Sequence, residues 1–183
     1  MAFIVVYDAN VRYPSLLRDV LIRVAQRGLV RARWTERILD EVFHNLKQNR
    51  PNLDPVKLER TRELMNASIR DVLVEGYEAL EDAVSLPDPK DRHVLAAAIR
   101  AHAQTIVTAN VKDFPSGELS KWDIEARHPD DFLVDQFHLD PIALHVIVQQ
   151  IADGTANPPL TQAEVLDGLE RSGATQAAAL LRR

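Results

Sequence analysis

The chain has 183 residues, which is long enough for one domain with a substantial core and a small addition. Hydrophobic residues make up 46% of it and charged residues 27%, a composition that excludes an intrinsically disordered protein. The formal net charge of −5 argues against a protein that binds nucleic acid over its whole surface, because such proteins are usually basic. It does not exclude a nuclease, in which metal ions neutralise the substrate locally.

The sequence also bears on cellular location. No apolar run approaches the roughly 20 residues that a membrane-spanning helix needs. The short apolar stretch at the N-terminus follows no basic region, so it is unlike a secretion signal. The chain has no cysteine, which rules out disulfides and thiolate metal sites. We therefore expect a cytoplasmic protein with no membrane association.

Strand and helix patterns alternate along the first two thirds of the chain. Strands are predicted at 3–7 (FIVVY), 29–34 (LVRARW), 105–109 (TIVTA) and, with a weaker pattern, 123–126 (DIEA). Helices are predicted from Ser15 to Gly28, from Thr35 to just before Pro51, from Asp54-Pro55 to about Ser68, and from Asp88-Pro89 with Val94, Leu95, Ala98 and Ile99 as a buried stripe. The stretch 72–80 (VLVEGYEAL) is ambiguous. Strands separated by helices predict βαβ units and a mostly parallel sheet covered on both faces.

The pattern changes from about Pro129 onward. Helices are predicted at 141–152, 162–171 and 174–182, and the turn-rich segment DGTANPPL separates the first of them from the second. Thr161, with Glu164 three residues later, forms the capping-box pattern at the start of the middle helix. The C-terminal part is therefore predicted to be a small all-helical addition.

Four carboxylates are the candidate functional residues. Asp8 follows the first strand and Asp113 follows TIVTA, while Asp91 lies in the first turn of a predicted helix. Glu41 comes three residues after Ile38 and so borders the buried stripe of its helix. Sites in open α/β sheets lie at the carboxyl ends of strands, so all four could converge at one edge. Clustered carboxylates without His or Cys ligands select Mg²⁺ or Mn²⁺, which suits phosphodiester hydrolysis.

Each acid also has an ordinary structural interpretation. From its strand-end position alone, Asp8 is an even choice between a turn residue and a site residue. Asp91 falls three residues after Asp88, where an acid favours the helix dipole, and that interpretation is the better one for Asp91 alone. Glu41 alone is better read as a solvated helix residue, and Asp113 alone as a loop residue. Spacing by itself therefore makes the site plausible and no more.

Four motifs follow one another along the chain: VVYDANV, LDEVFHNL, LPDPKDRHVLAAAI and IVTANVKDFP. Together and in this order they resemble the PIN domain, and most closely its bacterial branch that includes the VapC-type toxins. The resemblance covers roughly 1–135, ending near HPDDFL, and implies a three-layer α/β/α fold with a mostly parallel central sheet. We accordingly expect a metal-dependent nuclease domain at 1–135 and a helical C-terminal extension at 136–183. The extension has no motif that we can assign.

The resemblance implies a metal-dependent endoribonuclease that cleaves RNA with water activated by Mg²⁺ or Mn²⁺, leaving a 5′-phosphate and a 3′-hydroxyl. The acidic cluster of the family falls on Asp8, Glu41, Asp91 and Asp113, and none of the four is replaced. Asp8 and Asp113 would be the main direct ligands, Asp91 would share a metal or bind through water, and Glu41 would hold a metal-bound water or act as base. Thr108, Asn110 and Asn10 match or neighbour polar positions of the family and would orient the ligands.

Other side chains near the motifs have weaker claims. Arg12, Arg92 and Lys112 could contact phosphate, although a solvated surface charge is the favoured interpretation for each. His93 could act as an acid–base group, but a packed or surface histidine is favoured. The two tryptophans, Trp34 and Trp122, could stack on bases, but packing roles are favoured for both.

Resemblance to the toxin branch also implies partners. Such proteins usually meet a cognate antitoxin whose C-terminal segment lies across the active-site groove and places a basic residue against the carboxylates. Homodimer formation is a further expectation that the sequence leaves open. The helical extension could extend the fold, cover the groove edge, contact the antitoxin or help to form a dimer, and the sequence does not choose among these.

Two other classes of protein were weighed. A signalling receiver needs an acidic pair after the first strand and a lysine after a late strand, whereas this chain has a single Asp8 followed by Asn10 and no such lysine. A non-catalytic PIN-like module, such as an RNA-processing partner or a scaffold, is the second alternative. The intact acidic set argues against it but does not prove turnover.

Overall fold

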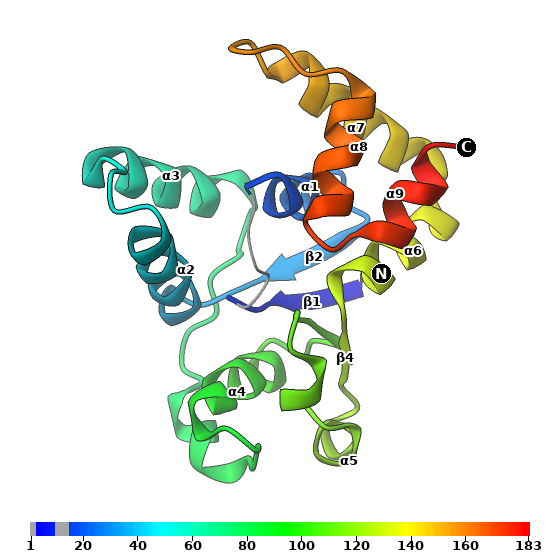
Figure 1. Ribbon diagram of the computed structural model, residues 1–183. Coiled ribbons are helices and arrows are strands. Elements are labelled where there is room, and N and C mark those ends of the chain that lie inside the picture. Colours follow the sequence, from blue (N-terminus) through cyan, green and yellow to red (C-terminus); the bar gives the residue numbers. More distant parts are fainter. Residues whose placement is uncertain (1–2, 10–14) are drawn as a thin grey trace.

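A computed structural model describes residues 3–9 and 15–183 of the protein (Figure 1). Its centre is a four-stranded sheet of β1 (Phe3–Tyr7), β2 (Val30–Arg33), β3 (Thr105–Val107) and β4 (Glu125–Arg127). The strand order is β2-β1-β3-β4, and every pairing is parallel. The predicted parallel sheet is thus confirmed. Its carboxyl ends all lie at one edge, which is where Asp8 and Thr108 leave their strands.

Helices cover both faces of this sheet. Helix α1 (Ser15–Gln26) lies on one side, and α4 (Arg92–Arg100) packs against β1 and β3 on the other (Figure 1). Helices α2 (Glu36–Asn49) and α3 (Pro55–Ser68) form a hairpin beyond the end of β2. The predicted end of α1 and start of α2 are confirmed. Gly28 takes a left-handed φ of 75° after α1, and the Thr35 hydroxyl accepts the Ile38 N–H at 3.0 Å. The three-layer α/β/α architecture is confirmed.

Several boundaries differ from the predicted ones. The ambiguous segment 72–80 runs beside Trp34, which forms a parallel bridge with Leu73, and then enters a short 3₁₀ helix, η1 (Glu78–Ala83). A 3₁₀ turn, η2 (Pro89–Asp91), precedes α4, because the Asp88 carboxylate accepts the Lys90 N–H at 2.9 Å and caps the turn instead of the helix. Strand β4 starts two residues later than predicted, after Asp123 adopts a left-handed φ of 56°.

Short elements connect β3 to β4, and four helices follow. The connection contains η3 (Val111–Asp113), α5 (Ser116–Leu119) and η4 (Ser120–Trp122). The C-terminal helices are α6 (Pro129–Leu139), α7 (Pro141–Gly154), α8 (Gln162–Arg171) and α9 (Thr175–Leu181). Three of these were predicted, and the capping box of α8 is present. Helix α6 was missed because its buried face includes the polar side chains of Asp130 and Gln136, which obscure the apolar periodicity.

The C-terminal helices pack directly on the sheet-covering layer. Helices α7 and α8 both contact α1 (Figure 1). At Gly168 the backbone of α8 approaches α1 so closely that an added Cβ would lie 2.5 Å from a methyl carbon of Leu16. The extension therefore shares its core with the α/β domain.

Among the described helices, none is long and apolar enough to cross a membrane.

A buried carboxylate joins α6 to α9. The side chain of Asp130 is 5% exposed, and its two oxygens accept the Gln176 N–H at 3.0 Å and the Ala177 N–H at 2.9 Å. These N–H groups belong to the first turn of α9, where no partner exists within the helix. Asp130 therefore caps α9 from a neighbouring helix.

Replacing Asp130 by alanine is expected to lower the free energy of unfolding by about 2 kcal/mol, because two buried donors lose a charged acceptor. Urea unfolding followed by circular dichroism would measure the loss. Asp131→Ala is the matched control, since Asp131 is exposed and makes one 3.3 Å contact with the Gln176 side chain. Equal stability of the two variants would contradict the capping role.

Candidate functional site

Thr108, which directly follows β3, holds the Asp8 side chain at the end of the central strand β1. Its carboxylate is 4% exposed and accepts the Thr108 hydroxyl at 2.8 Å, and its backbone N–H donates to Val107 O at 3.0 Å. The Thr108 hydroxyl in turn accepts the Asn110 N–H at 3.1 Å. Thr108 therefore orients Asp8 while it anchors the chain that leads to Asp113.

The environment of Asp8 disfavours its ionised form. Burial raises the pKa of Asp8 above its ordinary value, and repulsion from Glu41 raises it further. The Thr108 hydrogen bond and the nearby His93 act in the opposite direction without reversing the shift.

Glu41 approaches the site from α2 through a contact with His93. Its Oε1 lies 2.9 Å from His93 Nε2, and its side chain is 42% exposed. His93 belongs to the first turn of α4 and is 1% exposed. Within the described residues, neither nitrogen of the His93 ring has a well-aligned hydrogen bond. The contact is thus a close approach of an imidazole on α4 to a carboxylate on α2.

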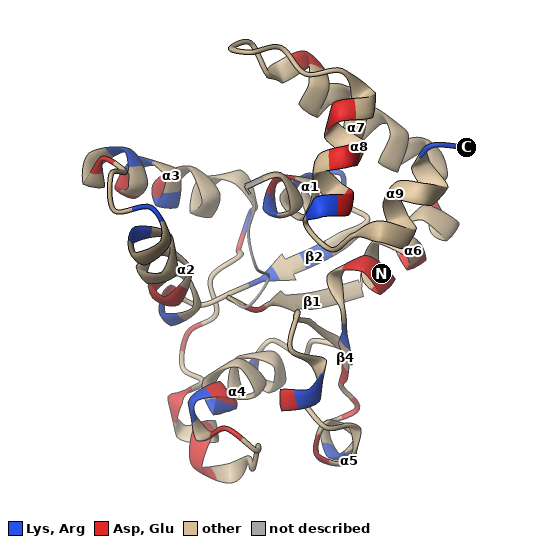
Figure 2. Ribbon diagram, in the orientation of Figure 1, with Lys and Arg blue, Asp and Glu red and all other residues tan. Residues whose placement is uncertain are grey.

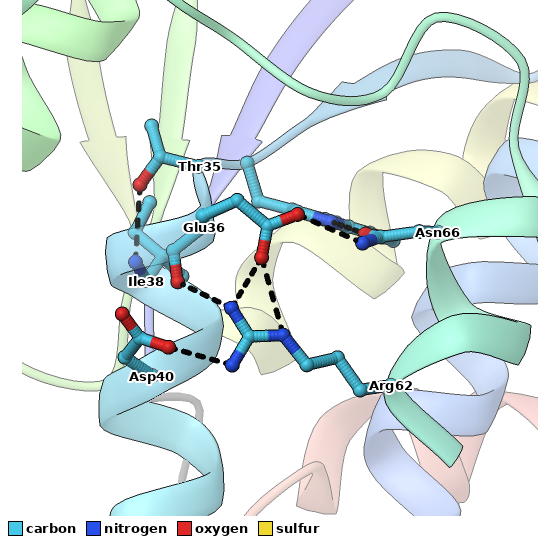
Figure 3. A network of polar contacts seen from close by, with 7 residues as sticks. Thr35, Glu36, Ile38, Asp40, Arg62 and Asn66 are labelled. Atoms are coloured by element: carbon cyan, nitrogen blue, oxygen red, sulfur yellow. Dashed lines mark hydrogen bonds and ion pairs between the residues drawn. The ribbon is translucent and has the colours of Figure 1, made fainter. Parts of the chain in front are cut away.

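A polar network fixes the start of α2 (Figure 3). Arg62 of α3 pairs with Glu36 and with Asp40, the latter at 2.6 Å, and donates to the Glu36 carbonyl at 3.2 Å. Asn66 donates to Glu36 at 3.1 Å and accepts the Trp34 indole N–H at 2.9 Å. The network joins α3 to the first turns of α2, and so it limits where Glu41 can lie.

Asp91 shows most clearly that the acids share one neighbourhood. Partial burial, followed by repulsion from Asp8, Asp88, Asp113 and Glu41, raises the pKa of Asp91 to about 6 from its ordinary 3.8. The Asp91 side chain makes no capping hydrogen bond to α4. The helix-dipole interpretation therefore does not account for its environment, in which partial burial comes first and repulsion from Asp88 and the other three predicted acids follows.

The carboxylates do not form a ready-made metal cage. In the part of the chain that the structure describes, no group of three or more His, Asp or Glu side chains is arranged to hold a metal ion. The donor set nevertheless fits a hard divalent cation, because all four side chains are carboxylates, which supply the oxygen ligands that such cations prefer.

An open groove of about 640 Å³ lies beside Glu41 and Asp91. It is lined by Arg37, Asp40, Glu41, His44, Asn45, Asp88, Lys90 and Asp91. Acidic and basic residues are interspersed on the helices around it (Figure 2). Four of these lining residues were not predicted from the sequence: Arg37, His44, Asn45 and Lys90. The first three follow from helical spacing, since residues three or four positions from Glu41 share its face of α2.

The remaining predicted residues are two that the structure does not describe, two cationic side chains and a buried tryptophan. Asn10 and Arg12 lie outside the described residues. Lys112 is exposed, and Arg92 is partly buried with an Nε that has no hydrogen-bond partner in the described part of the chain. The packing role favoured for Trp34 is confirmed, because the residue is 2% exposed.

Trp122 differs from that expectation. It is 39% exposed, so it lies at the surface instead of in the core. Asn110 contributes through its backbone, whose N–H donates to Thr108, and its side chain makes no capping hydrogen bond to η3.

Comparison with known proteins agrees with this fold and arrangement. A family model of the PIN domain matches residues 4–112, and the chain belongs to that family. A second model, the VapC50 C-terminal domain, matches residues 129–183. The chain is also 48% identical over 80 residues to a Mycobacterium tuberculosis (strain ATCC 25618 / H37Rv) protein described as "Putative ribonuclease VapC50".

The match to that relative is partial. It covers 44% of this chain, and it spans 47% of the length of the relative. No solved structure matches the chain.

Proposed function

We propose that the protein is a metal-dependent endoribonuclease and the toxin of a type II toxin–antitoxin module. The observation that carries the proposal is the partial burial of Asp91 together with its repulsion by Asp8, Asp88, Asp113 and Glu41, which raise the pKa of Asp91 to about 6. Membership of the PIN domain family and similarity to a relative described as a ribonuclease support the same activity. The match of residues 129–183 supports the VapC branch.

The four carboxylates would hold one or two divalent cations, Mg²⁺ or Mn²⁺. Such cations supply a water nucleophile at neutral pH and neutralise the charge of the phosphodiester. Asp8 and Asp113 would bind directly, Asp91 would share a cation or bind through water, and Glu41 would hold a water or take its proton. Thr108 would keep Asp8 oriented, which is the usual task of a residue that hydrogen-bonds a metal ligand.

The groove gives the substrate a place beside the acids. Arg37 and Lys90 line it and would contact phosphates, in addition to Arg92 and Lys112 near the motifs. Arg37 is held toward η1 by Glu81, whose oxygens lie 3.1 and 3.2 Å from its Nη1. RNA in the cytoplasm would be the substrate, and an antitoxin segment would compete for the same groove. Residues 1–135 would form the nuclease domain and 136–183 the extension.

Removal of divalent cations tests this function directly. The purified chain, incubated with total bacterial RNA, is expected to produce new 5′-phosphate ends with Mg²⁺ or Mn²⁺, and to produce none after chelation with EDTA. Sequencing of RNA 5′ ends would measure both the activity and the target. Cleavage that persists in EDTA would overturn the proposal. Binding of RNA without any cleavage would instead assign a non-catalytic PIN-like module.

A further inference from the structure

We propose that His93 is a positioning residue that holds the carboxylate of Glu41 at the acid cluster, an inference that rests on the proposed nuclease function. The imidazole is 1% exposed, so it cannot reach a substrate. Its Nε2 lies 2.9 Å from Glu41 Oε1, and this contact joins α4 to α2. The role is therefore exerted through Glu41.

The His93–Glu41 contact lies where it can fix the position of the acids relative to one another. Asp91 immediately precedes α4, and His93 lies in the first turn of that helix. Glu41 lies on α2, whose first turns are tied to α3 by Arg62 (Figure 3). The His93–Glu41 contact therefore connects α2, which lines the groove, to the first turn of α4, directly after the groove residues Lys90 and Asp91.

A packing role alone does not explain an imidazole at this position. The residues that follow it, Val94 to Ala98, are apolar and fully buried, and an apolar side chain at 93 would avoid the desolvation of two ring nitrogens. Buried polar atoms normally have partners, so an imidazole with one carboxylate contact needs an explanation.

Glu41 supplies that explanation. With 42% of its side chain exposed, Glu41 is free to sample several rotamers in the groove. An N–H on His93 Nε2 would select the rotamer that points toward Asp8 and Asp91, and a small rotation of Glu41 would align the two groups. Residues that orient metal ligands in this way typically change metal affinity 10-fold to 100-fold when they are replaced.

The first test is spectroscopic and needs no metal. In long-range ¹H–¹⁵N spectra of the metal-free full chain, His93 is expected to be the Nε2–H tautomer, and Glu41→Gln is expected to shift its Nε2 resonance. Asp8→Asn should leave the tautomer unchanged. A proton on Nδ1 with an unprotonated Nε2, or a spectrum that Glu41→Gln does not alter, would overturn the proposal.

The second test measures Mn²⁺ binding by calorimetry and RNA cleavage side by side. His93→Leu keeps a similar volume but has no donor, and we expect it to bind Mn²⁺ about 10-fold more weakly than the wild type. His93→Gln retains an N–H and should recover most of the affinity. His138→Leu is the matched control, because His138 is exposed on α6 and does not line the groove, so its loss should leave Mn²⁺ binding unchanged.

The outcomes separate this proposal from the proposed function. Wild-type protein that neither binds Mn²⁺ nor cleaves RNA would overturn the function, and the tautomer would still decide the His93–Glu41 contact. A folded His93→Leu protein with wild-type Mn²⁺ affinity would overturn the positioning role alone. If His93→Leu does not fold, the comparison of His93→Gln with the wild type and the spectroscopic test decide the question.

Discussion

Replacing Asp8 by asparagine is expected to lower the RNA cleavage rate by about a thousandfold or more, while it raises the thermal stability of the metal-free protein. The loss of activity follows from the removal of a negatively charged metal ligand, and changes at residues that act as a catalytic unit have effects of this size. Asparagine keeps the shape of the side chain and can still accept the Thr108 hydroxyl.

The gain in stability follows from the sign of the pKa shift. Burial and repulsion from Glu41 raise the pKa of Asp8 in the folded state, so the folded protein binds a proton more readily than the unfolded chain does. Stability linked to Asp8 is therefore greatest below the unfolded pKa and is lost as the pH rises through the folded one. At neutral pH the ionised side chain opposes folding, and a neutral isostere removes that opposition.

Thermal unfolding in EDTA and an RNA cleavage assay with Mg²⁺ would measure the two effects on one preparation. Asp123→Asn is the matched control: this acid is exposed, and asparagine tolerates its left-handed backbone conformation. The control should alter neither quantity. Full cleavage by Asp8→Asn would mean that the activity comes from another site or another protein.

The central features of the fold were accessible from the sequence because they depend on local patterns. An apolar run such as 3–7 predicts a strand buried on both faces, and strands alternating with helices predict a parallel sheet. Parallel strands end at one edge, so Asp8 and the segment that leads from β3 to Asp113 leave the sheet at the same edge. The acids on helices, Glu41 and Asp91, needed the resemblance, because each alone has an ordinary helical role.

The features that could not be predicted from the sequence depend on burial and contacts in the packed fold. His93 is one of six histidines, and nothing local distinguishes an imidazole that is 1% exposed from a surface one. The polar residue Asp130 hides the periodicity of α6, although its buried carboxylate serves to cap α9. Arg37 contributes to the groove because Glu81, 44 positions further on, packs beside it. Such pairings arise from the packed fold and leave no periodic signal.

Replacing Asp91 by asparagine is expected to lower RNA cleavage about a hundredfold and to remove a pH dependence from the stability of the metal-free protein. In the folded chain the pKa of Asp91 is raised to about 6, whereas its ordinary value is 3.8. Between these values the folded state binds more protons than the unfolded state, so the free energy of unfolding falls as the pH rises. Because the side chain is only partly buried, solvent screening reduces the fall linked to Asp91 to about 1 kcal/mol.

The quantity to measure is the difference in unfolding free energy between the wild type and Asp91→Asn, determined in EDTA from pH 4 to pH 7. The difference between the two proteins is needed because Asp8 makes the free energy of unfolding of both fall as the pH rises. The variant should gain stability relative to the wild type as the pH rises, and a flat difference would show that Asp91 does not lie among repelling carboxylates. Added Mn²⁺ should stabilise the wild type more at pH 7 than at pH 5, because protons compete with the cation for the same oxygens. The repulsion that lowers the free energy of unfolding of the metal-free protein at neutral pH would thus favour cation binding.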